Sequence, residues 1–173
     1  MFKMRFPDGE VEGKSVKELR GMEGLRVRAL YAQLGLQHGV TWKGRNYDRQ
    51  NWDTADDINR TLSAANSSLY ALCAAVCCSL GYVPSLGFVH DSGTLPFIYD
   101  VADLYKHLTS IPAAFLAVRQ DAKDDGELVR KLFKERVEEE RLLQRIPKDL
   151  AALFQMAEAT PLQAGNRPPS AIA

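Results

Sequence analysis

The strongest constraint on the fold of this chain is an apolar repeat through the middle of its sequence. The repeat spans residues 58–80 and consists of Ile58, Leu62, Ala65, Leu69, Leu72, Val76 and Leu80. Side chains spaced by three or four residues share one face of an α-helix, whereas a strand alternates every two residues. The repeat therefore predicts one long, buried helix that begins near Asp53 or Thr54 and ends at Gly81.

The rest of the sequence also favours helices. Ser15 and Glu18 form a capping box, which predicts a helix from there to about His38, ended by Gly39. The apolar face expected for this helix is formed by Val16, Leu19, Val27, Leu30 and Leu34. Further helices are predicted over residues 97–109, 112–120 and 127–145, and from Pro147 to about Glu158. The sequence thus predicts an all-α fold, with a compact multi-helix domain over residues 1–159 and a disordered, proline-rich tail over 160–173.

Composition excludes some classes of protein and leaves others open. The net charge of the 173 residues is zero, which argues against indiscriminate nucleic-acid binding. Charge is nevertheless uneven, because residues 1–50 carry 10 Lys and Arg against 6 Asp and Glu, and residues 51–103 carry 1 against 6. A basic segment next to an acidic one suits an enzyme that binds phosphates around a carboxylate-bound cation. Charge counts alone nevertheless favour an accidental distribution.

Neither a membrane span nor a disulfide framework is predicted. No apolar run reaches the roughly 20 residues that cross a bilayer, and the N-terminus lacks the apolar segment of a signal peptide. Cys73, Cys77 and Cys78 crowd one short segment without a histidine at zinc-ligand spacing. We therefore expect small core thiols in a reducing cytoplasm, and no membrane partner.

Several residues could carry chemistry, although each also has a structural explanation. Asp100 and Asp103 lie three residues apart near the start of a predicted helix, where acidic side chains also complement the helix dipole. His90 lies ten residues earlier in a loop rich in glycine and proline. Glu23 lies in the segment GMEG, whose glycines suggest either close helix packing or clearance for a ligand beside the carboxylate. A Glu, a His and an Asp together would suit Mg²⁺ or Mn²⁺ better than zinc, but spacing alone does not bring them together.

An ordered series of motifs resembles a known family. The pieces LRGMEG, RVR, GVTWKGRNYD, GFVH and YDVADLYK follow one another as in the catalytic region of the CRISPR-associated integrases, type I-E subgroup. The resemblance runs from Met1 to about Phe115. It implies a metal-dependent DNA endonuclease and integrase that acquires spacers for a CRISPR array. In this reaction a DNA 3′-hydroxyl attacks a phosphodiester of the array, which is a transesterification.

The resemblance also implies roles for individual residues. Glu23, His90 and Asp103 correspond to the metal ligands, with Asp100 as an acidic catalytic neighbour and Mg²⁺ or Mn²⁺ as the cofactor. Positions associated with DNA handling, substrate contact or the wall of the site correspond to Arg20, Arg28, Arg45, Tyr47, Trp52, Tyr70 and Lys106. Asp91 departs from the family pattern, because a small neutral residue tends to follow the histidine there.

The family further implies partners and a second domain. Its members form a homodimer through an N-terminal β domain, bind DNA and act with a small ferredoxin-like partner protein. We expect this chain to lack the β domain and to be a fragment of such an integrase. Three hypotheses follow: an active nuclease and integrase, a non-catalytic DNA-binding or assembly fragment, and a plain helical domain. The motif series argues against the third.

Overall fold

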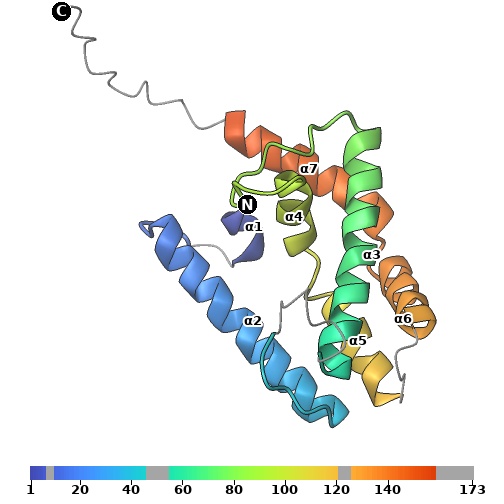
Figure 1. The fold of residues 1–173 in the computed structure, drawn as a ribbon. Coiled ribbons are helices and arrows are strands. Elements are labelled where there is room, and N and C mark those ends of the chain that lie inside the picture. Colours follow the sequence, from blue (N-terminus) through green and yellow to red (C-terminus); the bar gives the residue numbers. More distant parts are fainter. Residues whose placement is uncertain (7–9, 46–54, 121–125, 159–173) are drawn as a thin grey trace, which may run out of the picture.

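The computed structural model describes residues 1–6, 10–45, 55–120 and 126–158. Over these ranges the chain consists of helices joined by turns and loops, without strands, which confirms the all-α fold (Figure 1). The helices are α1 (Phe2–Arg5), α2 (Val16–His38), α3 (Asp57–Ser79), α4 (Pro96–Asp103), α5 (Ser110–Arg119), α6 (Gly126–Glu139) and α7 (Leu142–Glu158). The predicted tail and the end of the predicted domain, residues 159–173, lie outside the described residues.

Helix α3 is the central element of the bundle. It packs against α4, α5, α6 and α7, and its side chains Leu62, Ala65, Leu69 and Cys73 are fully buried (Figure 1). Asp56 caps its first turn by accepting a hydrogen bond from the amide of Asn59. By length and hydropathy α3 could also cross a membrane, contrary to the expectation above, but 44% of its apolar window is already buried inside the bundle. A core helix passes this test as readily as a membrane span.

Helix α2 lies along the side of the bundle and packs mainly against α5 (Figure 1). The predicted capping box is present, and Gly39 ends the helix in the left-handed conformation at φ 68°. Packing is concentrated in its C-terminal half, where Tyr31 stacks on Trp42 with ring centroids 4.4 Å apart. The predicted apolar face is wrong at its first position, because Val16 is exposed.

The third predicted helix, expected over residues 97–109, is shorter than predicted, and the fourth begins two residues earlier than predicted. Helix α4 ends at Asp103, residues 104–109 form successive turns, and α5 begins at Ser110. The Ser110 hydroxyl donates to Asn66 of α3, and the buried Thr109 hydroxyl donates to the carbonyl of Tyr105. These contacts with the core favour a change of direction that apolar spacing alone does not reveal.

The boundary between the last two helices also differs from the prediction. Helix α6 ends at Glu139, and Arg141 has a positive φ of 50° before α7 begins. Pro147 therefore lies inside α7 rather than in its first turn. Burial of Leu142, Ile146 and Leu150 on one face of α7 offsets the lost backbone hydrogen bond of the proline.

Candidate functional site

Asp100 organises the loop between α3 and α4. Its side chain is fully buried, and its Oδ2 accepts hydrogen bonds from the amides of Phe88 and, at 2.9 Å, Val89. Its Oδ1 accepts from the amide of His90 at 3.1 Å and lies 2.7 Å from Nδ1 of the same residue. Burial raises the pKa of Asp100, but these hydrogen bonds outweigh it, so the pKa lies below its ordinary value. Asp100 therefore remains an anion that holds the loop.

Gly87 allows this loop to approach the helix. A Cβ atom at this position would collide with the carbonyl oxygen of His90 and would lie 2.9 Å from Cβ of Pro96. No side chain fits into that space. The glycine of GFVH is therefore required by the close packing of the loop on the start of α4.

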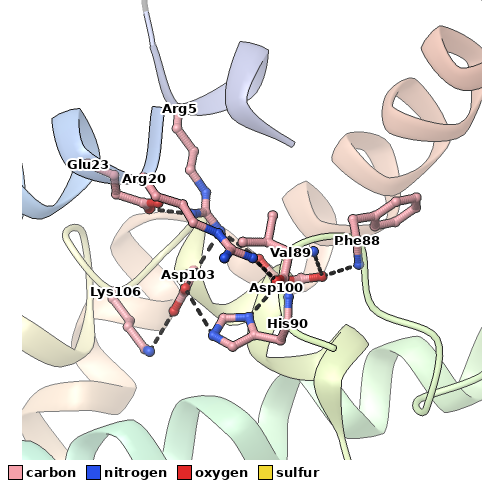
Figure 2. A network of polar contacts seen from close by, with 9 residues as sticks. All are labelled: Arg5, Arg20, Glu23, Phe88, Val89, His90, Asp100, Asp103 and Lys106. Atoms are coloured by element: carbon pink, nitrogen blue, oxygen red, sulfur yellow. Dashed lines mark hydrogen bonds and ion pairs between the residues drawn. The ribbon is translucent and has the colours of Figure 1, made fainter. Parts of the chain in front are cut away.

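The contact with Asp100 also determines which nitrogen of His90 faces the site. A carboxylate only accepts hydrogen bonds, so the neutral ring carries its proton on Nδ1 and leaves the lone pair on Nε2. That nitrogen points toward Asp103, 4.0 Å from its Oδ2 (Figure 2). His90 is 39% exposed at the side chain, so its free nitrogen is accessible to a ligand.

Arg5, from α1, lies between the acidic side chains (Figure 2). Its guanidinium forms an ion pair with Glu23, approaches Oδ2 of Asp103 at 3.7 Å and donates to the backbone carbonyl of Asp100 at 3.2 Å. The Arg5 side chain is only 7% exposed, against 24% for Glu23 and 20% for Asp103. Sequence reasoning missed this residue, because an arginine in a short terminal segment resembles any surface cation.

Lys106 holds the other oxygen of Asp103. Its Nζ lies 2.5 Å from Oδ1 of Asp103 and 5.0 Å from the ring centroid of Tyr70, which packs edge-on against Tyr99. Burial lowers the pKa of Lys106, but Asp103 and then Tyr70 raise it by more, so the pKa lies above its ordinary value. Lys106 is therefore a fixed positive charge beside the site, in the turn that follows α4.

The other residues expected to handle DNA differ in their surroundings. Arg20 is exposed and donates to the carbonyl of Val89, which ties α2 to the histidine loop (Figure 2). Arg28 is exposed on α2. Arg45 instead donates to Asn59 at 2.8 Å and to Ser63 at 2.7 Å, both in α3. Its guanidinium therefore fastens the segment around residue 45 to the first turns of α3. Tyr47 and Trp52 lie outside the described residues, and Asp91 is exposed.

Among the described residues, no element packs closely against the glycines around Glu23. A Cβ atom on Gly21 or Gly24 would meet no atom within 4 Å. Within the described part of the chain, close packing therefore does not explain the segment GMEG. The open surface leaves clearance beside the Glu23 carboxylate.

A cavity of about 200 Å³ adjoins the acidic side chains. Glu23, Asp103 and Arg5 lie on its wall together with Arg26 and His107, and its remaining lining is apolar, from Phe6, Val27, Leu30 and Ile111. Burial, then nearby arginines, lower the pKa of His107, so this ring is neutral near pH 7.

The donor set fits a divalent cation by its chemistry. Two carboxylates and an imidazole nitrogen, whose ring is oriented by a further carboxylate, suit Mg²⁺ or Mn²⁺. Within the described ranges no three His, Cys, Asp or Glu side chains lie close enough to hold an ion as they stand. The same carboxylates already hold a cationic group, the guanidinium of Arg5.

The family model and the relatives that match this chain all carry the same family name. The family model described as "CRISPR associated protein Cas1" matches residues 7–154. A CRISPR-associated endonuclease Cas1 of Thermus thermophilus is 45% identical over 155 residues, which cover 90% of this chain and 48% of the relative. The Cas1 endonuclease of Escherichia coli K12 is 41% identical over 171 residues, which cover 99% of this chain and 53% of the relative.

A solved structure supports the same family. The crystal structure of a TtCas1–DNA complex matches with a TM-score of 0.81 and 44% identity, over 96% of this chain and 58% of the other. This chain thus spans about half the length of the curated relatives it matches. On sequence and fold together, the chain belongs to the Cas1 family of CRISPR-associated proteins.

Proposed function

We propose that this chain carries the catalytic site of a divalent-metal-dependent DNA endonuclease and integrase that inserts spacers into a CRISPR array. The observation that supports this most is that Glu23 and Asp103 face one cationic group, while Nε2 of His90 lies 4.0 Å from Oδ2 of Asp103 (Figure 2). The three residues come from α2, α4 and the loop before α4. The names of the relatives, and the DNA in a related crystal structure, support the same activity.

Each side chain of the site has a distinct task in this proposal. Glu23, Asp103 and Nε2 of His90 would hold Mg²⁺ or Mn²⁺. When bound, the cation would polarise a phosphodiester and neutralise charge on its oxygens. Asp100 is a positioning residue, because its oxygens are occupied by the loop amides and by Nδ1 of His90.

The positive side chains around the site suit a DNA backbone. Lys106 keeps its charge beside Asp103, and Arg20 and Arg28 are exposed on α2. Cations at such positions contact phosphates without reading sequence. Tyr70 and Tyr99 add an aromatic wall next to Lys106.

The proposed reaction exchanges one phosphodiester for another. The 3′-hydroxyl oxygen of the incoming DNA bonds to a phosphorus of the array strand, and the bond from that phosphorus to its leaving 3′-oxygen breaks. The proton lost by the attacking hydroxyl is balanced by protonation of the leaving oxygen. With water as the nucleophile the same exchange is hydrolysis, which accounts for an endonuclease activity on branched DNA.

The finer assignments belong to the same proposal. The type I-E subgroup, a homodimer and a small ferredoxin-like partner are proposed from the resemblance of the motif series, and a cytoplasmic location is proposed from the clustered cysteines. Leu25 and Leu36 are exposed apolar residues on α2, consistent with an association surface. The free thiols Cys73, Cys77 and Cys78 are consistent with a reducing compartment.

A 3′-end joining assay tests the proposed function. The chain is incubated with DNA bearing a free 3′-hydroxyl and a duplex target, in Mg²⁺, in Mn²⁺ or in EDTA, with branched DNA as a second substrate. We expect metal-dependent products that fall on the order of 100-fold or more in His90→Ala. His38→Ala, which changes a histidine at the far end of α2, is the matched control and should keep full activity.

The assay also separates this function from its alternative. DNA binding without joining or cleavage in any metal would contradict the catalytic proposal. It would support a non-catalytic DNA-binding or assembly fragment of the integrase. Equal product with and without His90 would contradict the assignment of the metal ligands.

A further inference from the structure

The guanidinium of Arg5 faces two of the candidate metal ligands, Glu23 and Asp103. It pairs with Glu23, and its second terminal nitrogen lies 3.7 Å from Oδ2 of Asp103. Oδ2 is also the atom that His90 approaches at 4.0 Å through Nε2. One buried cationic side chain thus faces two of the three ligands, and the third ligand approaches the same oxygen of Asp103 (Figure 2).

Arg5 and a metal ion bound by Glu23 and Asp103 would compete for the same side of the Asp103 carboxylate. One oxygen faces Arg5 and the other lies 2.5 Å from the ammonium of Lys106. A divalent cation bound by Glu23 and Asp103 would place its two positive charges against the guanidinium. Repulsion between like charges at such short range is strong where both groups are shielded from water.

Few polar contacts besides the carboxylates hold Arg5 in place. Helix α1 has only four residues, none of them fully buried, although Met4 packs against the core. Arg26 donates a hydrogen bond to the carbonyl of Arg5 and stacks on the Phe6 ring at 4.8 Å. Nε of Arg5 is buried without a hydrogen-bond partner among the described residues. The guanidinium therefore gains little from staying once its carboxylate partners are taken.

We infer that Arg5 is a built-in substitute for the divalent cation, and that metal binding displaces its guanidinium and loosens α1 from the site. The inference rests on the proposed function, because it requires Glu23, His90 and Asp103 to be the ligands. In the metal-free protein Arg5 neutralises the carboxylates and keeps the site folded. The cost of displacing it sets the metal concentration at which the site fills.

Metal affinity tests the competition directly. Mn²⁺ binding to the full chain is measured by calorimetry and by the loss of the free Mn²⁺ signal in electron paramagnetic resonance. We expect Arg5→Ala to bind Mn²⁺ roughly tenfold or more tightly than the unchanged chain, in line with a typical coupling between sites. Lys3→Ala removes an exposed positive charge from the same helix and should leave the affinity within about twofold.

Hydrogen exchange of the unchanged chain tests the displacement without any substitution. The amides of Met4 and Phe6 donate within α1, to Met1 and Phe2. Saturating Mn²⁺ should speed their exchange if α1 is released, while the buried amides of α3 keep their protection. Because it uses the unchanged chain, this measurement tests the release of α1 even if Arg5→Ala fails to fold.

The outcomes separate the inference from the proposed function. Unchanged or weaker Mn²⁺ binding in Arg5→Ala, or α1 amides that stay equally protected, would overturn the inference while leaving the metal site intact. Mn²⁺ binding that survives Glu23→Gln and His90→Ala would overturn the ligand assignment, and the inference with it. Tighter binding in Arg5→Ala that is abolished by adding His90→Ala supports both.

Discussion

At the scale of single residues, the site depends on a carboxylate that does not face the ligand. Asp100 accepts hydrogen bonds from three consecutive amides and lies against Nδ1 of His90. Its neighbour in the motif, Asp103, faces the site instead and pairs with Arg5 and Lys106. Two aspartates three residues apart thus have different tasks, because one points into the loop and the other toward the open side of the helix.

Replacing Asp100 with asparagine tests this division. The amide group of the new side chain would present hydrogen-bond donors to backbone N–H groups that need an acceptor. Asp100→Asn should therefore lower the free energy of unfolding by about 2 kcal/mol or more. It should also weaken the preference of His90 for the Nδ1–H tautomer.

Chemical denaturation and the ¹⁵N shifts of the His90 ring measure these two effects. Asp91→Asn is the matched control, because Asp91 is exposed beside the same loop. An Asp100→Asn protein with unchanged stability and an unchanged tautomer would contradict the positioning role.

At the scale of elements, the N-terminal half of α2 depends on its cap more than on packing. Of its first half only Leu19 is buried, and a Cβ atom added to Gly21 or Gly24 would meet no described atom of another element within 4 Å. The capping box supplies what packing does not, because Ser15 accepts from the Glu18 amide while Glu18 accepts from the Ser15 amide. Glu23 lies about one and a half turns further along, so the cap steadies the helix that presents this carboxylate.

Ser15→Ala tests the contribution of the cap. We expect a loss of about 1 kcal/mol in helix stability, with faster hydrogen exchange over residues 18–24. The hydrogen bonds with Ser15 hold the pKa of Glu18 below its ordinary value of 4.5, so this pKa should rise in the variant.

The sign of the pH dependence follows from that shift. The support that Glu18 gives to the helix is fully present above its unfolded pKa and is lost as pH falls through the lower folded pKa. An NMR titration of Glu18 in both proteins measures the shift. Ser67→Ala, on the exposed side of α3, is the control. An unchanged Glu18 titration in Ser15→Ala would show that the box does not form.

At the scale of the whole molecule, a basic helix lies beside a central apolar one. Helix α2 carries Arg20 and Arg28 on its exposed surface, while α6 lies on the other side of α3 (Figure 1). The zero net charge of the chain hides this arrangement, because acidic and basic residues cancel over the whole sequence. Phosphate contacts are therefore expected on the α2 side of the bundle.

Salt dependence of DNA binding tests this expectation. Affinity for duplex DNA should fall steeply as salt rises, and Arg28→Ala should reduce both the affinity and the salt slope, equally for unrelated sequences. Lys131→Ala removes an exposed charge from α6 and should change neither the DNA affinity nor the salt slope. Fluorescence anisotropy between about 50 and about 200 mM salt measures the slope. A DNA affinity that does not change with salt would contradict contacts to the phosphates. So would an Arg28→Ala variant that loses affinity for one DNA sequence only.

The sequence by itself determined the local structure and the identity of the motif residues. The capping box of α2 and Gly39 depend on contacts within a few residues and are present as predicted. The apolar repeat correctly predicted a long helix with Ile58, Leu62, Ala65 and Leu69 buried, but α3 begins at Asp57 and Leu80 is exposed. The order of the motifs indicated the family and pointed to Glu23, His90 and Asp103. These features were accessible because local spacing and capping chemistry do not depend on the rest of the fold.

Only the tertiary structure decided how those residues meet. The break after Asp103 depends on partners such as Asn66, 44 residues away from Ser110, and the place of Pro147 depends on burial of its helix face. Arg5 carried the same sequence signal as any exposed cation, and the motif series associated Arg45 with DNA rather than with α3. Arg5 reaches Glu23 across 18 residues and Asp100 across 95, whereas Arg45 is bound to α3. Long-range packing chooses the partner of a charged side chain, and no local pattern records that choice.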